Sequence, residues 1–178
     1  MLCGSSIFQE WGEQADVAGD AAAFPEFDVV NAAVGGTVSG DWLTRLPGAL
    51  ERHDPAAVGL YVGSNDLNAG VPPAEIVANL RTLRDMATHT GRAFVWFGVL
   101  HCPQKRDRAD VIDTLHDRLR GETSLCDLSP ALSLDGEPVA GYFQDDGVHL
   151  TRGAYARLAA FVLGRRPFAG VTDGGRGG

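Results

Sequence analysis

The run AVGLYV at residues 57–62, followed by GSND at residues 63–66, decides the fold class of this chain. An apolar, β-branched run that stops at a glycine is typical of a strand buried on both faces of a parallel sheet. Similar runs occur at residues 27–31 and 93–99, and a weaker one lies at residues 124–128. The sequence therefore predicts several strands of a single sheet.

Helical patterns separate these runs. Apolar residues recur at helical spacing in four segments, at residues 42–50, 76–87, 111–119 and 155–162. Alternation of strands and helices predicts an α/β fold with a parallel sheet covered on both faces. A first strand is expected before Gly4, which gives a sheet of about five strands. That strand is very short unless the natural protein starts further upstream, because only three residues precede Gly4.

Length and composition indicate one ordinary globular domain. The chain has 178 residues, of which 44% are hydrophobic and 21% charged, and this is enough to build one hydrophobic core. The glycine-rich end predicts a domain at residues 1–168 and a disordered tail at residues 169–178. The formal net charge is -8 and the basic residues are scattered, so a nucleic-acid partner is not expected.

The cysteines and the N-terminus indicate a cellular compartment. Three widely spaced cysteines do not form a disulfide framework. The first residues lack the basic and apolar regions of a signal peptide, and no apolar stretch is long enough to span a membrane. We therefore expect a soluble, cytoplasmic protein.

Polar residues follow the ends of the predicted strands. They are GSS at residues 4–6, GGT at residues 35–37 and GSND at residues 63–66, and a fourth polar segment, DDGVH at residues 145–149, precedes the last predicted helix. Ligands of doubly wound sheets bind beyond the carboxyl ends of the strands. We therefore expect these four segments to meet at one edge of the sheet.

Together these segments contain the parts of an acyl-transfer site. A serine such as Ser6 needs an adjacent base, for which His149 is suited. Asp146 is three residues from His149, so its carboxylate could orient the imidazole. Three donors could stabilise an oxyanion: the backbone N–H groups of Ser6 and Gly36, and the side-chain amide of Asn65.

The four segments resemble the sequence blocks of the SGNH/GDSL serine hydrolases. Gly-Ser-Ser-Ile at residues 4–7 is similar to the Gly-Asp-Ser-Leu block, which implies Ser6, and not Ser5, as the nucleophile. Residues 31–36 and 63–66 resemble the second and third blocks, which implies Gly36 and Asn65 in the oxyanion hole. Asp-Gly-Val-His at residues 146–149 is similar to the closing Asp-x-x-His block.

This resemblance covers the chain up to about residue 168, and it has two departures. Ser5 replaces the usual aspartate of the first block, and Ala33 stands where many members have glycine. Neither change removes a catalytic atom. The resemblance implies a flavodoxin-like three-layer α/β/α sandwich.

The resulting functional hypothesis is hydrolysis of a small or medium ester, or thioester, through an acyl-enzyme on Ser6. The expected partner is a small-molecule ester, and no metal or organic cofactor is required. Two alternatives use the same triad: an acyltransferase and a tailoring enzyme of a small-molecule pathway. A non-catalytic binding module is the alternative from another class.

Each motif also has a simpler structural interpretation. Ser5 and Ser6 could cap a helix, and residues 35–36 could form a plain turn. Residues 65–66 could form an Asx-turn, and His149 could cap the last helix. The turn at residues 35–36 is compatible with an oxyanion role for Gly36. All of these structural interpretations remain open from the sequence.

The other histidines lack a partner pattern. His101 follows a predicted strand and is a candidate substrate-binding residue. We expect His53, His89 and His116 to be solvated surface residues. No metal site is predicted from their spacing.

Overall fold

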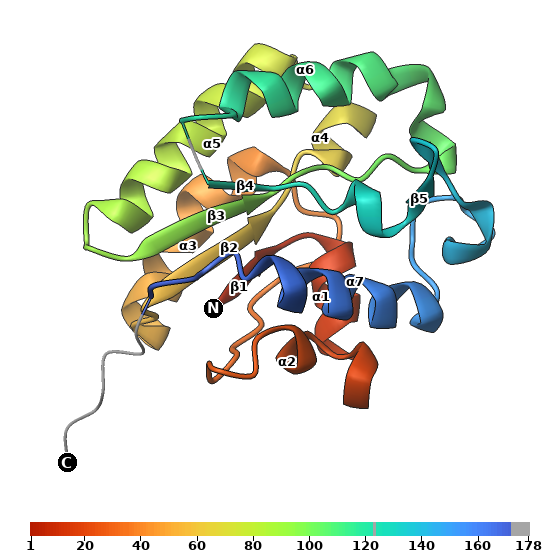
Figure 1. Cartoon of the computed structure of the whole chain (residues 1–178). Coiled ribbons are helices and arrows are strands. Elements are labelled where there is room, and N and C mark those ends of the chain that lie inside the picture. Colours follow the sequence, from red (N-terminus) through yellow and green to blue (C-terminus); the bar gives the residue numbers. More distant parts are fainter. Residues whose placement is uncertain (123, 172–178) are drawn as a thin grey trace.

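The computed structural model describes residues 1–122 and 124–171 of the chain. It has three layers, with a parallel four-stranded sheet between two groups of helices (Figure 1). This confirms the predicted α/β/α architecture. The strands, in their order across the sheet, are β1 (Leu2–Gly4), β2 (Ala57–Tyr61), β3 (Ala93–Phe97) and β4 (Ser124–Cys126).

The sequence prediction of a fifth strand at residues 27–31 is wrong, because the sheet has four strands. Within this stretch only Asn31 pairs with the sheet, in an isolated parallel bridge to Leu2. The end of the stretch runs along the free edge of β1, where Leu2 N–H donates to the Val30 carbonyl at 2.8 Å. The contact with β1 begins only at Val30 and continues past this stretch, since Ala32 N–H donates to the Leu2 carbonyl and Val34 N–H to the Gly4 carbonyl, both at 2.8 Å. Most of residues 27–31 therefore precedes the segment that lies along β1.

The four predicted long helices are confirmed, and shorter elements complete the fold. The α-helices are α1 (Ser6–Gly12), α2 (Asp20–Ala23), α3 (Ser39–His53), α4 (Ser64–Asn68), α5 (Pro73–Thr88), α6 (Ala109–Leu119) and α7 (Arg152–Arg165). The 3-10 helices are η1 (Asp16–Ala18), η2 (Pro103–Arg108), η3 (Ser129–Ala131) and η4 (Ala140–Tyr142), and β5 (Ser133–Leu134) pairs with β6 (Glu137–Pro138).

Alternating side chains of the strands build a core on each face of the sheet. Leu2, Tyr61 and Phe97 pack with α1, α2 and α7 on one face. Their sequence neighbours, including Cys3 and Trp96, pack with α3, α5 and α6 on the other face. Burial on both faces explains why the strands are continuous apolar runs.

The predicted tail falls mostly outside the described residues, which end at residue 171. Val171 itself still packs against the core on the α7 side of the sheet. The proposed domain end at residue 168 therefore stays a prediction. Across the described part of the chain, we find no helix that combines the length and the apolar character needed to cross a membrane.

Candidate active site

The short first strand delivers Ser6 to the carboxyl edge of the sheet. β1 ends at Gly4, and Ser6 is the first residue of α1. Ser5 occupies the N-cap position, but its side chain makes no capping hydrogen bond, and it is buried. Ser6 is only partly buried, so its hydroxyl is the one of the pair that a substrate can approach.

Ser6 lies within hydrogen-bonding distance of His149, although 143 residues separate them. The Ser6 Oγ–His149 Nε2 distance is 3.0 Å. On the other side of the ring, His149 Nδ1 lies 2.5 Å from Asp146 Oδ2. An ionised carboxylate only accepts hydrogen bonds, so Nδ1 carries the proton and Nε2 is left as an acceptor for the serine hydroxyl.

Asp146 is held by its own loop as well as by the imidazole. Its Oδ1 accepts hydrogen bonds from the backbone N–H groups of Val148, at 2.8 Å, and His149, at 2.9 Å. The hydrogen bond from the His149 ring, followed by that from Val148 N–H, lowers the pKa of Asp146 to about 2. The carboxylate therefore stays ionised at neutral pH and keeps the imidazole in one orientation.

The position of His149 differs from that of a helix cap. The N-cap of α7 is Thr151, whose side chain accepts a hydrogen bond from Ala154 N–H. His149 lies two residues before that cap, and its ring contacts Ser6 and Asp146 instead.

The expected oxyanion donors lie on three segments: Ser6 at the start of α1, Gly36 in the turn before α3, and Asn65 in α4. An added methyl group at Gly35 would lie 3.7 Å from Ser6 Cβ, so the glycine turn passes beside the serine. Gly36 has a φ of 76°, a conformation that favours glycine, and it is exposed. The Asn65 amide donates to the Thr37 carbonyl at 3.0 Å. An amide nitrogen has two N–H groups, so this bond leaves the second one available.

Asp66 joins the start of α4 to the start of α3, a role that our interpretation of the GSND motif did not include. Its side chain is fully buried and accepts from Ser39 Oγ at 2.5 Å and from Ser39 N–H at 2.9 Å. It also accepts from Gly63 N–H at 3.1 Å. The spacing of Gly63 and Asp66 matches a capping box, and this is the signal that could have identified the contact.

Glu10 is a second carboxylate near His149 that sequence reasoning missed. Its Oε1 lies 3.6 Å from His149 Nε2, and its Oε2 is 3.4 Å from the Tyr155 hydroxyl. Burial and the nearby Glu10 raise the pKa of Tyr155, which therefore stays a hydroxyl donor. Glu10 is four residues after Ser6 on α1, so helical spacing could have indicated that both face the same way.

His101 has its described contacts away from the serine. Its Nε2 lies 3.1 Å from Asp113 Oδ1 on α6, and its backbone N–H donates to Ser129 Oγ at 3.1 Å. Its ring also packs edge-on against His116. The suggested role of His101 in substrate binding stays a prediction.

Comparison with known proteins identifies the family. The GDSL-like lipase/acylhydrolase family model matches residues 2–157. This chain belongs to that family. The match includes Ser6 and the Asp146–His149 loop, so the proposed triad lies inside the family domain.

Two curated relatives and one solved structure resemble the chain. Esterase TesA from Pseudomonas aeruginosa is 28% identical over 75% of this chain and 66% of its own length. An arylesterase from Vibrio mimicus is 28% identical over 75% of this chain and 67% of its own length. A crystal structure of TesA has a TM-score of 0.74 and 26% identity, covering 93% of this chain and 97% of that one. The matches to the curated relatives thus span about two thirds of those proteins' lengths.

Proposed function

We propose that this chain hydrolyses small or medium carboxylic esters, including thioesters, through an acyl-enzyme on Ser6. The single observation that supports this most strongly is the line of three groups from Ser6 Oγ to His149, at 3.0 Å, and on to Asp146, at 2.5 Å. The similarity to proteins named esterase and arylesterase agrees with this chemistry. The cytoplasmic location stays a prediction from the sequence.

In the first half-reaction, Ser6 Oγ attacks the ester carbonyl carbon while His149 Nε2 takes the hydroxyl proton. The imidazole becomes a cation between Asp146 and the reacting centre. The ionised Asp146 stabilises this cation without taking a proton itself. The tetrahedral intermediate then collapses, and His149 passes the proton to the departing alcohol or thiol, which leaves an acyl-enzyme.

Three N–H donors are proposed to stabilise the oxyanion: the backbone of Ser6, the backbone of Gly36 and the free N–H of Asn65. The Thr37 carbonyl fixes the Asn65 amide, and Asp66 fixes the N-terminal end of α4, the helix that carries Asn65. Donors held in place before the reaction need no reorganisation when negative charge develops.

In the second half-reaction, water replaces the alcohol. His149 Nε2 takes a proton from water as the water oxygen attacks the acyl carbonyl carbon. The second intermediate collapses, the Ser6 oxygen regains its proton from His149, and the carboxylic acid leaves. The chain's own residues supply every proton transfer in this cycle.

A fluorophosphonate probe tests the nucleophile directly. We expect Ser6 Oγ to displace fluoride from phosphorus, which adds one probe per chain at the peptide that contains Ser6. Ser6→Ala should abolish labelling and lower hydrolysis of p-nitrophenyl esters by about 10⁴–10⁶-fold. Ser5→Ala is the matched control and should keep the label, because Ser5 is buried and does not contact His149.

Equal labelling of wild type and Ser6→Ala would contradict the assignment. A folded wild-type protein that never reacts would favour the binding-module alternative. A protein that reacts and then transfers its acyl group to an added alcohol faster than to water would favour the acyltransferase. Far-UV circular dichroism of each variant establishes that it is folded.

A further inference from the structure

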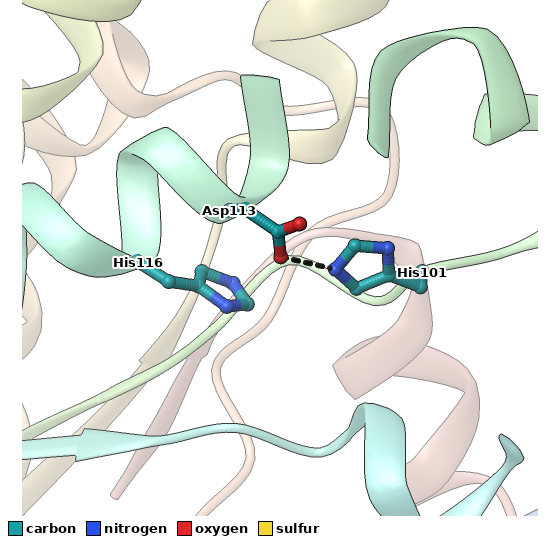
Figure 2. Close-up of side chains that lie close together, drawn as sticks. All are labelled: His101, Asp113 and His116. Atoms are coloured by element: carbon teal, nitrogen blue, oxygen red, sulfur yellow. Dashed lines mark hydrogen bonds and ion pairs between the residues drawn. The ribbon is translucent and has the colours of Figure 1, made fainter. Parts of the chain in front are cut away.

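Three potential metal ligands converge between the loop that follows β3 and helix α6. They are His101 and, on α6, Asp113 and His116, and their ligand atoms all lie within 4.8 Å of one another. In Figure 2, Asp113 lies between the two imidazole rings. Asp113 and His116 are three residues apart, so one helix face presents both.

His116 is buried, which corrects our expectation of a surface residue. Its exposed fraction is 3%, and its ring packs against Trp96. Gly98 makes room for it, because a methyl group there would lie 2.6 Å from His116 Nε2. Among the described residues, this buried Nε2 has no hydrogen-bond partner. An ion pair between His101 and Asp113 alone would not explain why the buried Nε2 of His116 has no hydrogen-bond partner.

The surroundings favour a neutral imidazole next to negative charge. Burial is the largest cause that lowers the pKa of His116, and His101 and then Arg120 act in the same direction. The carboxylates of Asp113 and Asp127 act in the opposite direction. A neutral imidazole has a free lone pair, which is the form that binds metal ions.

We propose that His101, Asp113 and His116 bind one divalent transition-metal ion, with Zn²⁺ as the best match. Two imidazoles and one carboxylate are an established ligand set for zinc, and a fourth tetrahedral position is left for water. Ligand atoms around such an ion are about 3.4 Å apart. The His101–Asp113 distance of 3.1 Å is already close to this value, and the ion would replace the proton that they share.

The ion can enter from solvent and would join two elements. The Asp113 side chain is 64% exposed, whereas that of His101 is 19% exposed. Binding would fix the loop after β3 to α6. Three residues beyond His101, the Gln104 N–H donates to the Gly147 carbonyl at 3.2 Å. Since Gly147 lies between Asp146 and His149, the ion would stiffen the support of the catalytic loop.

Calorimetric titration of the untagged, chelator-treated protein with ZnCl₂ tests this site without any measurement of activity. We expect one Zn²⁺ per chain and a higher melting temperature with zinc. Loss of a residue that only hydrogen-bonds to a metal ligand weakens metal binding by about 10–100-fold. Asp113 is proposed as a ligand itself, so Asp113→Asn should weaken zinc binding by at least about 100-fold. Asp110→Asn is the matched control, since Asp110 is also exposed on α6, and it should bind as wild type does.

His149→Ala separates this site from the catalytic histidine, where zinc could also bind. This variant should keep the wild-type stoichiometry and affinity. Equal zinc affinity in wild type and Asp113→Asn would overturn the proposal. Loss of binding in His149→Ala, with binding retained in Asp113→Asn, would also overturn it and would place the ion at the active site.

Discussion

In the described part of the chain, two histidine–aspartate pairs are in contact, and they are built differently. Asp146 and His149 belong to one loop, with 2.5 Å between Oδ2 and Nδ1. Asp113 and His101 come from different elements, with 3.1 Å between Oδ1 and Nε2. The first pair leaves Nε2 facing a serine hydroxyl, whereas the second has a buried imidazole beside it.

The difference shows that a histidine–aspartate pair does not by itself define a chemistry. With a hydroxyl as the third partner, the pair can move a proton. With a second neutral imidazole as the third partner, it can ligate a cation. The carboxylates also differ in support, because two backbone N–H groups hold Asp146 in addition to the ring.

Substitution of one aspartate in each pair is the strongest way to break this comparison. Asp146→Asn should lower kcat for ester hydrolysis by about 10³–10⁴-fold, because an amide can favour the wrong tautomer of His149. Asp113→Asn should cost far less, because Asp113 does not contact His149 or Ser6 in the described structure. Steady-state kinetics on p-nitrophenyl acetate measures both effects.

Asp145→Asn is the matched control for Asp146→Asn, since Asp145 is its exposed sequence neighbour. It should keep wild-type kinetics. A large loss in Asp145→Asn, together with an active Asp146→Asn, would exchange the roles of the two aspartates.

A smaller loss of activity is expected from removal of an oxyanion donor, because such donors are proposed only near the Asp146–His149 pair. Asn65→Ala should lower kcat by about 10²–10³-fold, the usual cost of one oxyanion donor. KM should change little, because the oxyanion exists only in the transition state and the intermediates. Asn68→Ala, at the exposed end of the same short helix, should have no effect. A higher KM with unchanged kcat would make Asn65 a substrate-binding residue instead.

Much of this organisation could be predicted from local sequence. Continuous apolar runs located β2 and β3, and apolar residues at helical spacing located the four long helices. The position of the candidate site followed from the topology, since parallel strands end at the same edge of the sheet. The contact of Ser6 with His149 spans 143 residues, and the order of four family-like blocks, not spacing alone, indicated it.

Features that depend on tertiary neighbours could not be predicted in this way. The run at residues 27–31 has the composition of a strand, but in the folded chain only its last residues, Val30 and Asn31, lie along β1. The burial of His116 depends on the missing side chain at Gly98, which is 18 residues away in the sequence. The position of Glu10 beside His149 depends on how α1 and the catalytic loop meet.

The smallest expected effect concerns stability in acid and sharpens the contrast between the two aspartates. The pKa of Asp146 is lowered to about 2 in the folded protein, below the ordinary value of about 3.9 for an aspartate. The folded state therefore holds this proton less readily than the unfolded state. The resulting stabilisation is fully present above about pH 4 and is lost as the pH falls towards 2.

We therefore expect the melting temperature of wild type to exceed that of Asp146→Asn near pH 5, and the difference to shrink as the pH approaches 2. The Asp146 side chain is 48% exposed, so solvent screening should keep the difference to at most about 4 °C. Differential scanning calorimetry from pH 5 to pH 2 measures this trend, with Asp145→Asn as the control for loss of one carboxylate. A difference that stays constant or grows in acid would mean that the bond from His149 does not lower the pKa of Asp146.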